Sequence, residues 1–320
     1  MTADRSSMKY CSRALAVLAA LCAPVVAHTQ APATPAAKPP EPAADLQVQV
    51  VRPGLNVIMG AGGNVVAWSG VDGLVLVDTG LASSEAALVD AVTRISPAPV
   101  RFVINTNGHA DHAGGNEVFL RKGAVMIGVE SALEHDGRDP PVPAGNGDGV
   151  AAAAGRPMIT TTDTLALHVN GDRLDMVHVA DSHTSSDMVV RWSDADVVAL
   201  GDIYWNGQYP GIAVESGGSL AGMVAAIEAA LARSTARTVV VPGHGPVSNR
   251  AELAAYRDML VAVGRKVREA VEEGMGIVEI LDSKPTAEFD AKYGGPGALV
   301  APEEFVRSVY RDLAPKRPGR

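Results

Sequence analysis

The chain has 320 residues, of which 47% are apolar and 20% are charged, a balance that excludes an intrinsically disordered protein. Its formal net charge of −9 at neutral pH argues against a nucleic-acid-binding surface. Only 4% of the residues are aromatic, so alanine, valine and leucine must build most of the hydrophobic core.

The N-terminal residues 1–27 have the features of an export signal. Three basic side chains make a positively charged start, and an apolar run follows at residues 14–26. Small residues at the end of this run predict cleavage after Ala27, and therefore a periplasmic or secreted protein. The alternative is an uncleaved membrane anchor, but the run is short for a bilayer-spanning helix. We expect no stable membrane insertion after cleavage.

Both cysteines, Cys11 and Cys22, lie inside this predicted signal. The mature protein would then contain neither a disulfide nor a thiolate metal ligand, which suits an exported protein with a large core. Residues 28–45 are rich in alanine and proline and predict a flexible linker. We expect the folded part of the chain to begin near Leu46.

The folded part is predicted to start with an antiparallel meander. Four short apolar runs bounded by Gly and Asp indicate its strands: residues 47–51, 55–59, 64–68 and 74–77. Asp78-Thr79-Gly80 ends the last of them. A helix capped by Ser83 or Ser84 is expected to run to about Ile95, and the next strand covers residues 100–104.

The strand at residues 100–104 leads into a turn, Asn105 to His112, that contains two histidines and an aspartate. Imidazole and carboxylate groups so close together in sequence can converge on one point, and both are good ligands for zinc. Such a short motif recurs by chance, however. Its value depends on whether further ligands follow strands later in the chain.

The middle of the chain is predicted to alternate short elements with one long connection. A helix at residues 117–121 and a strand at 124–128 precede a segment, 136–156, that is crowded with Gly, Pro and Ala. This segment is too long for an ordinary connection, so we expect either a lid over a site, which we favour, or a disordered insertion. Four further strands are predicted: residues 164–168, 173–179, 188–192 and 197–200.

The rest of the chain is predicted to be mainly helical. Helices are expected at residues 220–232, 250–273 and 303–313, with one strand at 238–241. The order of strands followed by a helix and a strand occurs twice, which suggests two similar halves packed face to face. Residues 249–320 are expected to form a helical extension that packs on the main domain.

Three more metal-capable side chains follow or flank predicted strands, next to Gly, Ser or Thr. Loops at strand ends are where a rigid scaffold presents functional groups. Together with the histidines and aspartate of the turn, they make six candidate ligands: His109, Asp111, His112, His183, Asp202 and His244.

This ordered set of residues resembles the metallo-β-lactamase superfamily, whose pattern combines a DTG-type strand end with H-x-H-x-D-H, a distant His, a Gly-Asp and a late Gly-His. The resemblance covers residues 46–248. It implies an α+β fold, a four-layer αββα sandwich with the metals at one edge between the sheets. It also implies a hydrolase of small molecules that holds one or two zinc ions, or another divalent metal such as iron or manganese.

Carried over residue by residue, the resemblance implies two metal sites bridged by Asp202: Asn107, His109 and His183 in one, and Asp111, His112 and His244 in the other. Asn107 is a departure, because the family usually has histidine there. An amide oxygen is a weaker zinc ligand than an imidazole nitrogen. Asn107 is therefore expected either to ligate weakly or, as we favour, to hydrogen-bond a water or a neighbouring ligand. Asp78 is expected to act in the same supporting way.

The chemistry implied by this arrangement is hydrolysis. A cation lowers the pKa of bound water from ~15.7 towards ~7 and so supplies hydroxide at neutral pH. Asp111 is the candidate to orient this water and to pass a proton to the leaving group. We expect the substrate to be an ester, a thioester, a lactone or a cyclic amide, with β-lactams included but not favoured. The alternatives are a catalytically silent binding protein on the same fold and, less favoured, a secreted nuclease.

The residues after Asp202 are candidates for the wall of the substrate pocket. Tyr204, Trp205 and Asn206 follow it closely, and ordinary core and turn roles are an equal alternative for them. The histidines without a motif context are interpreted as surface or packing residues: His135, His168 and His178. No feature of the sequence indicates an oligomeric state.

Overall fold

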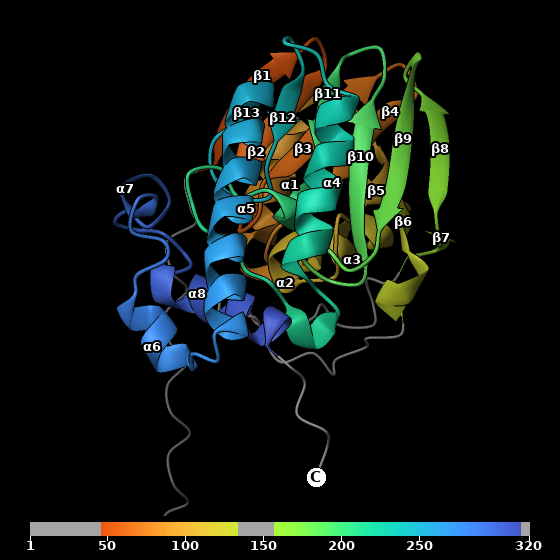
Figure 1. Cartoon of the computed structure of the whole chain (residues 1–320). Coiled ribbons are helices and arrows are strands. Elements are labelled where there is room, and N and C mark those ends of the chain that lie inside the picture. Colours follow the sequence, from red (N-terminus) through yellow and green to blue (C-terminus); the bar gives the residue numbers. More distant parts are fainter. Residues whose placement is uncertain (1–45, 134–156, 315–320) are drawn as a thin grey trace, which may run out of the picture. The chain divides into compact units, whose positions relative to one another are not determined.

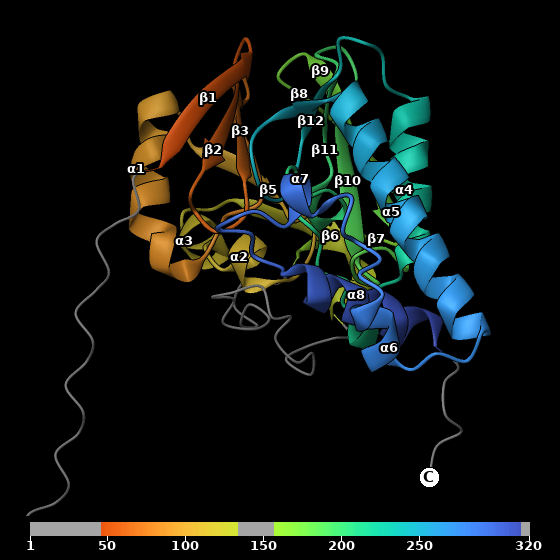
Figure 2. The same ribbon diagram turned by 60° about the vertical axis from the view of Figure 1, so that its left-hand side comes forward.

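The computed structural model describes residues 46–133 and 157–314. The predicted export signal, the linker and the segment at residues 136–156 lie outside these ranges. The described residues form two mixed sheets with helices on their outer faces (Figure 1). Figure 2 shows the layers edge on, with α1 (Glu85–Ile95) outside one sheet and α4 (Leu220–Ala232) outside the other. The predicted four-layer αββα sandwich is confirmed.

The first sheet has seven strands that follow one another in chain order: β1 (Gln47–Arg52), β2 (Leu55–Met59), β3 (Val65–Gly70), β4 (Gly73–Val77), β5 (Val100–Ile104), β6 (Val125–Val129) and β7 (Ile159–Thr161). Strands β1 to β4 form the predicted antiparallel meander, whereas β4, β5, β6 and β7 pair in parallel. Because parallel strands end at the same edge of a sheet, the segments that leave β4 and β5 emerge side by side.

The second sheet has six strands in the order β13-β12-β11-β10-β9-β8: β8 (Thr164–Val169), β9 (Asp172–Val179), β10 (Asp187–Trp192), β11 (Val197–Ala199), β12 (Val239–Val241) and β13 (Ser248–Asn249). Adjacent strands in this sheet pair antiparallel, except for β11 and β12, which pair in parallel. The segments that leave β11 and β12 therefore also emerge at one edge.

Three hydrophobic clusters hold the four layers together. The central cluster fills the space between the sheets, with Ile104 from the first sheet and Trp192 from the second. A second cluster joins the first sheet to α1, whose Leu88, Ala91 and Val92 are buried at the spacing of one helix face. The third joins the second sheet to the later helices. Each fully buried aliphatic side chain stabilises the fold by roughly 1.5–3 kcal/mol.

The helices lie outside the sheets or at the edge that carries the site: α2 (Ala110–Ala113), α3 (Asn116–Arg121), α5 (Arg250–Glu272), α6 (Ile277–Asp282), α7 (Asp290–Tyr293) and α8 (Pro302–Leu313). Helix α5 packs beside both α4 and α8. Asn249 caps α5, because its side chain accepts hydrogen bonds from the Ala251 and Glu252 amides. Of the helices in the described ranges, none combines the length and apolar character needed to cross a bilayer.

Candidate metal centre

The candidate ligands lie at one edge of the two sheets, each close to a strand end. Asp78 follows β4, the motif around His109 follows β5, His183 precedes β10, Asp202 follows β11 and His244 follows β12. The parallel pairs β4–β5 and β11–β12 deliver these segments to the same edge. A backbone hydrogen bond of 2.7 Å from the Met188 amide to the Thr106 carbonyl joins the two sheets there.

The six predicted ligands form two groups of three. In each group the ligand atoms all lie within 4.8 Å of one another: His109, His183 and Asp202 in the first group, and Asp111, His112 and His244 in the second. Each group thus offers the imidazole and carboxylate donors of a divalent-metal site. The structure therefore brings together the same side chains that the sequence motifs singled out.

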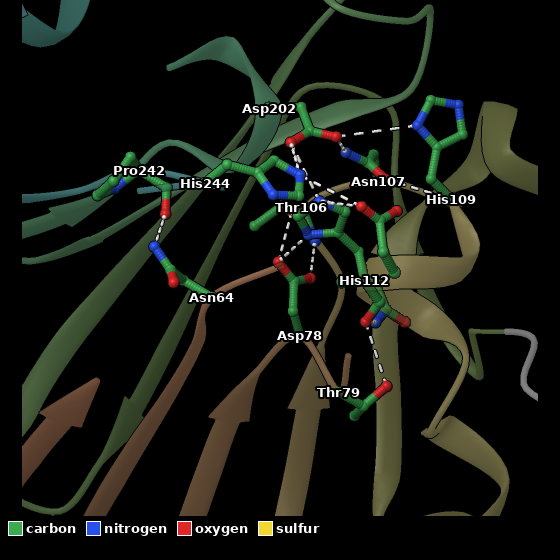
Figure 3. A network of polar contacts seen from close by, with 12 residues as sticks. Asn64, Asp78, Thr79, Thr106, Asn107, His109, His112, Asp202, Pro242 and His244 are labelled. Carbon is green, nitrogen blue, oxygen red and sulfur yellow. Dashed lines mark hydrogen bonds and ion pairs between the residues drawn. The ribbon is translucent and has the colours of Figure 1, made fainter. Parts of the chain in front are cut away.

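Asp202, a member of the first group, also faces the second group, and it is only 2% exposed. Its Oδ1 is 3.1 Å from His112 Nε2 and 3.2 Å from His244 Nε2. Its Oδ2 is 3.3 Å from His183 Nε2 and 3.8 Å from His109 Nδ1. Dashed lines in Figure 3 join this carboxylate to His109 and to His244. One oxygen faces each group, which is the geometry that a bridging ligand requires.

Unsatisfied atoms at the second group show that the donor set fits a metal ion. Within the described residues, His112 Nε2, His244 Nε2 and Asp202 Oδ1 are buried and have no hydrogen-bond partner. Their contacts with one another are the short ion-pair distances from Asp202 Oδ1 to the two nitrogens, 3.1 and 3.2 Å. A buried polar atom without a partner costs roughly 1–3 kcal/mol. A divalent cation at this point would satisfy all three atoms at once.

Asp78 contacts the ring nitrogen of His112 that points away from the second group. Asp78 Oδ2 is 2.8 Å from His112 Nδ1, and the amide and hydroxyl of Thr106 each donate to the same carboxylate at 2.7 Å. The φ of Asp78 is +64°, a left-handed conformation that turns the side chain towards the motif. A carboxylate on the far nitrogen of a histidine fixes its ring orientation. His112 therefore presents Nε2 to the second group.

Asn107 contacts the first group through hydrogen bonds. Its Oδ1 accepts from the His109 amide at 2.9 Å, and its Nδ2 donates to Asp202 Oδ2 at 3.1 Å. Both partners require this orientation of the amide, because a backbone N–H only donates and an ionised carboxylate only accepts. Asn107 thus holds the bridging carboxylate and the backbone of a neighbouring ligand, and the first group keeps three metal donors.

The loop that carries His183 is fixed by buried hydrogen bonds. His183 Nδ1 donates to the Gly211 carbonyl at 2.9 Å, which leaves Nε2 to face Asp202. Asp187, at the start of β10, accepts from the Thr184 amide at 2.7 Å and from the Thr184 hydroxyl at 3.0 Å. Asp187 was not among the site residues predicted from the sequence, although it lies only four residues after His183.

The electrostatics of the site favour a cation. Burial raises the pKa of Asp202, but His112, His183 and His244 outweigh it and hold this pKa well below 3.8. Burial likewise raises the pKa of Asp111, but His112 and His244 outweigh it and lower this pKa to about 2. Burial lowers the pKa of His183 to about 4. Burial lowers the pKa of His112 and of His244, but the nearby carboxylates, Asp202 first, outweigh it and raise both. Without a metal these two imidazoles therefore hold protons, and a bound cation would replace that positive charge.

The three pocket candidates, Tyr204, Trp205 and Asn206, contact the loop that carries His244. Tyr204 and Trp205 are each 1% exposed and belong to the hydrophobic core. The Trp205 ring packs against the His244 ring with centroids 4.2 Å apart. Asn206 donates its backbone amide to the His244 carbonyl at 2.9 Å and its side-chain amide to the Pro246 carbonyl at 2.9 Å. These contacts favour the core and turn roles over a pocket wall.

A comparison with family sequence profiles relates the chain to known proteins. The profile of the metallo-beta-lactamase superfamily matches residues 61–248. This range contains all six candidate ligands and the strands and loops that position them. A search of curated proteins found no match.

Several solved structures share the fold. The stereoselective inverting sec-alkylsulfatase Pisa1 from Pseudomonas sp. has 20% sequence identity and a TM-score of 0.61, and the match covers 83% of this chain and 50% of that one. The chain thus spans about half the length of this relative. A metallo-beta-lactamase from Pontibacter korlensis has 21% identity and a TM-score of 0.55, with 67% and 98% covered. One from Cronobacter sakazakii with an HARLDQ motif has 19% identity and a TM-score of 0.57, with 73% and 98% covered.

Proposed function

Because this chain belongs to the metallo-beta-lactamase superfamily, we propose that it is a zinc-dependent hydrolase of a small ester, thioester, lactone or cyclic amide. The family match confirms the resemblance predicted from the motifs and makes the chain a metallo-hydrolase. Zinc is proposed because imidazole and carboxylate donors without a thiolate are a common zinc ligand set. The substrate class is proposed from the chemistry that such a centre performs on carbonyl compounds.

The observation that best supports this proposal is the pair of ligand groups on either side of Asp202. All six donors are present. Within the described residues, His112 Nε2, His244 Nε2 and Asp202 Oδ1 are buried without a hydrogen-bond partner. A degenerate, catalytically silent member of this fold would be expected to lose several of these ligands. The arrangement therefore favours an enzyme over the silent binding protein.

The residues around the centre have separate roles in hydrolysis. A bound divalent cation supplies Lewis acidity, which lowers the pKa of water and polarises a carbonyl. Asp111, whose side chain is 16% exposed, is ionised at neutral pH and can accept a hydrogen bond from a water molecule. Water then adds to the carbonyl carbon while Asp111 takes its proton, the bond to the leaving group breaks, and Asp111 passes that proton to the leaving group. Asn107 keeps Asp202 in place during these steps.

A chelation experiment tests the proposed function. Turnover is measured on a panel of nitrophenyl esters, thioesters, lactones, β-lactams and an alkyl sulfate, the last because of the alkylsulfatase with a similar fold. We expect at least one carbonyl substrate to be hydrolysed, chelation to abolish this turnover, and added zinc to restore it. Zinc-free protein of unchanged stability, with no chelator-sensitive turnover on any substrate, would exclude the proposal.

A further inference from the structure

We infer that the turn between β2 and β3, residues 60–64, positions the second metal group, Asp111, His112 and His244. We call these residues the clamp turn. The inference rests on the proposed metal binding and assigns a role to a segment that contributes no ligand itself. From the sequence, residues 60–63 were interpreted only as a turn, and Asn64 as the first residue of the next strand. The structure shows that they contact the segments on both sides of the second group.

Asn64 holds the loop that carries His244. Its backbone amide donates to the Gly243 carbonyl at 2.7 Å. Its side-chain Nδ2 donates to the Pro242 carbonyl at 2.9 Å and to the Gly245 carbonyl at 2.8 Å. Figure 3 shows this side chain facing Pro242 next to His244. A residue of the first sheet therefore fixes the backbone on both sides of a ligand that belongs to the second sheet.

The glycines of the clamp turn lie against the other two ligands. The Gly63 amide donates to the Asp111 carbonyl at 2.9 Å. A Cβ at Gly63 would lie 2.5 Å from His112 Cε1 and 2.9 Å from each ring nitrogen, so only glycine fits against this imidazole. Gly62 has a φ of +114°, which an L side chain rarely adopts, and its Cβ would lie 3.1 Å from Asp111 Cβ.

These contacts reach all three ligands of the second group. The two histidines of the first group are held elsewhere, His109 by Asn107 and His183 by the Gly211 carbonyl. The clamp turn is itself anchored, because the Leu81 amide donates to the Ala61 carbonyl at 2.7 Å. Residues that orient a ligand from outside the coordination sphere typically change metal affinity by about 10–100-fold. A substitution in the clamp turn should therefore lower the affinity for the zinc ion of the second group and leave the affinity for the other ion unchanged.

The Asn64→Asp substitution tests this inference. It keeps the shape of the side chain but directs a carboxylate oxygen, in place of two N–H donors, at the Pro242 and Gly245 carbonyls. We expect one zinc ion to bind about 10–100-fold more weakly in a titration against a competing chelator, and the other to keep its affinity. The cobalt(II) absorption spectrum at limiting cobalt should resemble that of His244→Ala and differ from that of His183→Ala.

Asn56→Asp is the matched control. Asn56 is 8% exposed against 7% for Asn64, and its Nδ2 also donates to two carbonyls, of Gly54 at 3.3 Å and of Ala67 at 3.5 Å. It lies at the other end of the same hairpin, away from the ligands. Asn56→Asp should lower stability but keep both zinc affinities. Equal losses of zinc affinity in the two variants would reduce the clamp turn to a structural role and overturn the inference.

The remaining outcomes separate this inference from the proposed function. If the wild-type chain binds two zinc ions and Asn64→Asp binds both with unchanged affinity, only the inference fails. If the wild-type chain binds zinc at the first group alone, the inference fails and the proposed function stands. If it binds no zinc at either group, both fail. Should Asn64→Asp not fold, Gly63→Ala asks the same question, since its methyl group would press on His112. Gly108→Ala is its control, because a Cβ at Gly108 meets no atom within 4 Å.

Discussion

Asn107 determines how many donors the first metal group contains. Its amide is engaged by the His109 backbone and by Asp202, so the group keeps two imidazoles and one carboxylate oxygen. This residue stands where the family pattern has histidine. With Asp202 counted in both groups, the second group has four donors and the first has three. The donor that the first group lacks is at position 107.

An Asn107→His variant tests that position directly. The imidazole would add a fourth donor to the first group, and we expect zinc affinity there to rise at least about tenfold, because imidazole is the better ligand. The gain is measured by competition with a chelator of known affinity. Unchanged affinity in a folded variant would show that residue 107 does not face the first group.

Asp187 predicts a pH dependence of stability. Burial raises its pKa to about 7 despite two hydrogen bonds from Thr184. Because this folded-state pKa lies above the ordinary value of ~3.9, the protonated carboxyl contributes stability that is fully present below pH ~4. This contribution is lost as the pH rises through about 7.

An Asp187→Asn variant does not titrate at this position, so it separates this contribution from the rest of the protein. The Tm of the metal-free variant should rise relative to that of metal-free wild type as the pH increases from about 4 to about 7. A change of 1 kcal/mol corresponds to ~2–4 °C in a chain of about this size. A Tm difference that stays constant over this pH range would contradict the assignment.

At the level of elements, the strands and long helices were predictable because each has a clear periodicity and clear ends. The helices and strands that were not predicted from the sequence are short: β7, β13, α2, α6 and α7. A strand of two or three residues, such as Ser248–Asn249, has no measurable period. Pairing with a neighbouring strand creates such elements, and pairing is not visible in the local sequence.

The same reason explains which site residues could be predicted. The ligands stand in motifs next to strand ends, so their sequence context identified them. Asn64 and Pro242 are 178 positions apart, and only the folded sandwich brings them together. Tyr204 and Trp205 followed Asp202 closely enough to suggest a pocket, yet burial of these large rings against the helices placed them in the core.

The cap of α5 allows a prediction that separates stability from function. Asn249 accepts hydrogen bonds from the amides of Ala251 at 2.9 Å and Glu252 at 3.1 Å. Asn249→Ala should lower the free energy of unfolding by about 0.5–2 kcal/mol, because these amides lose their partner. Urea denaturation measures this loss. Zinc affinity should stay the same, and a parallel loss of zinc would contradict the separation of this cap from the centre.

At the scale of the whole molecule, neither half contains the site by itself. The first half supplies His109, Asp111 and His112, and the second supplies His183, Asp202 and His244. Each ligand group draws on both halves, so a metal ion can bind all its ligands only when the two sheets are packed together. Zinc binding should consequently stabilise the closed sandwich as a unit.

Thermal unfolding with and without zinc tests this coupling. A ligand that binds only the folded state stabilises it by about 2.7 kcal/mol at one hundred times its Kd. This corresponds to a rise in Tm of roughly 5–10 °C for a chain of about this size. Chelation should reverse the rise. An equal Tm in the presence of zinc and of chelator would contradict the coupling.

We propose that two metal ions bind, one on either side of the Asp202 carboxylate. Anomalous diffraction from a crystal of the zinc-loaded protein, recorded on both sides of the zinc absorption edge, tests it most directly. We expect two peaks, one among His109, His183 and Asp202 Oδ2, the other among Asp111, His112, His244 and Asp202 Oδ1. A map that lacks the zinc peak at one or both groups would contradict the two-metal arrangement.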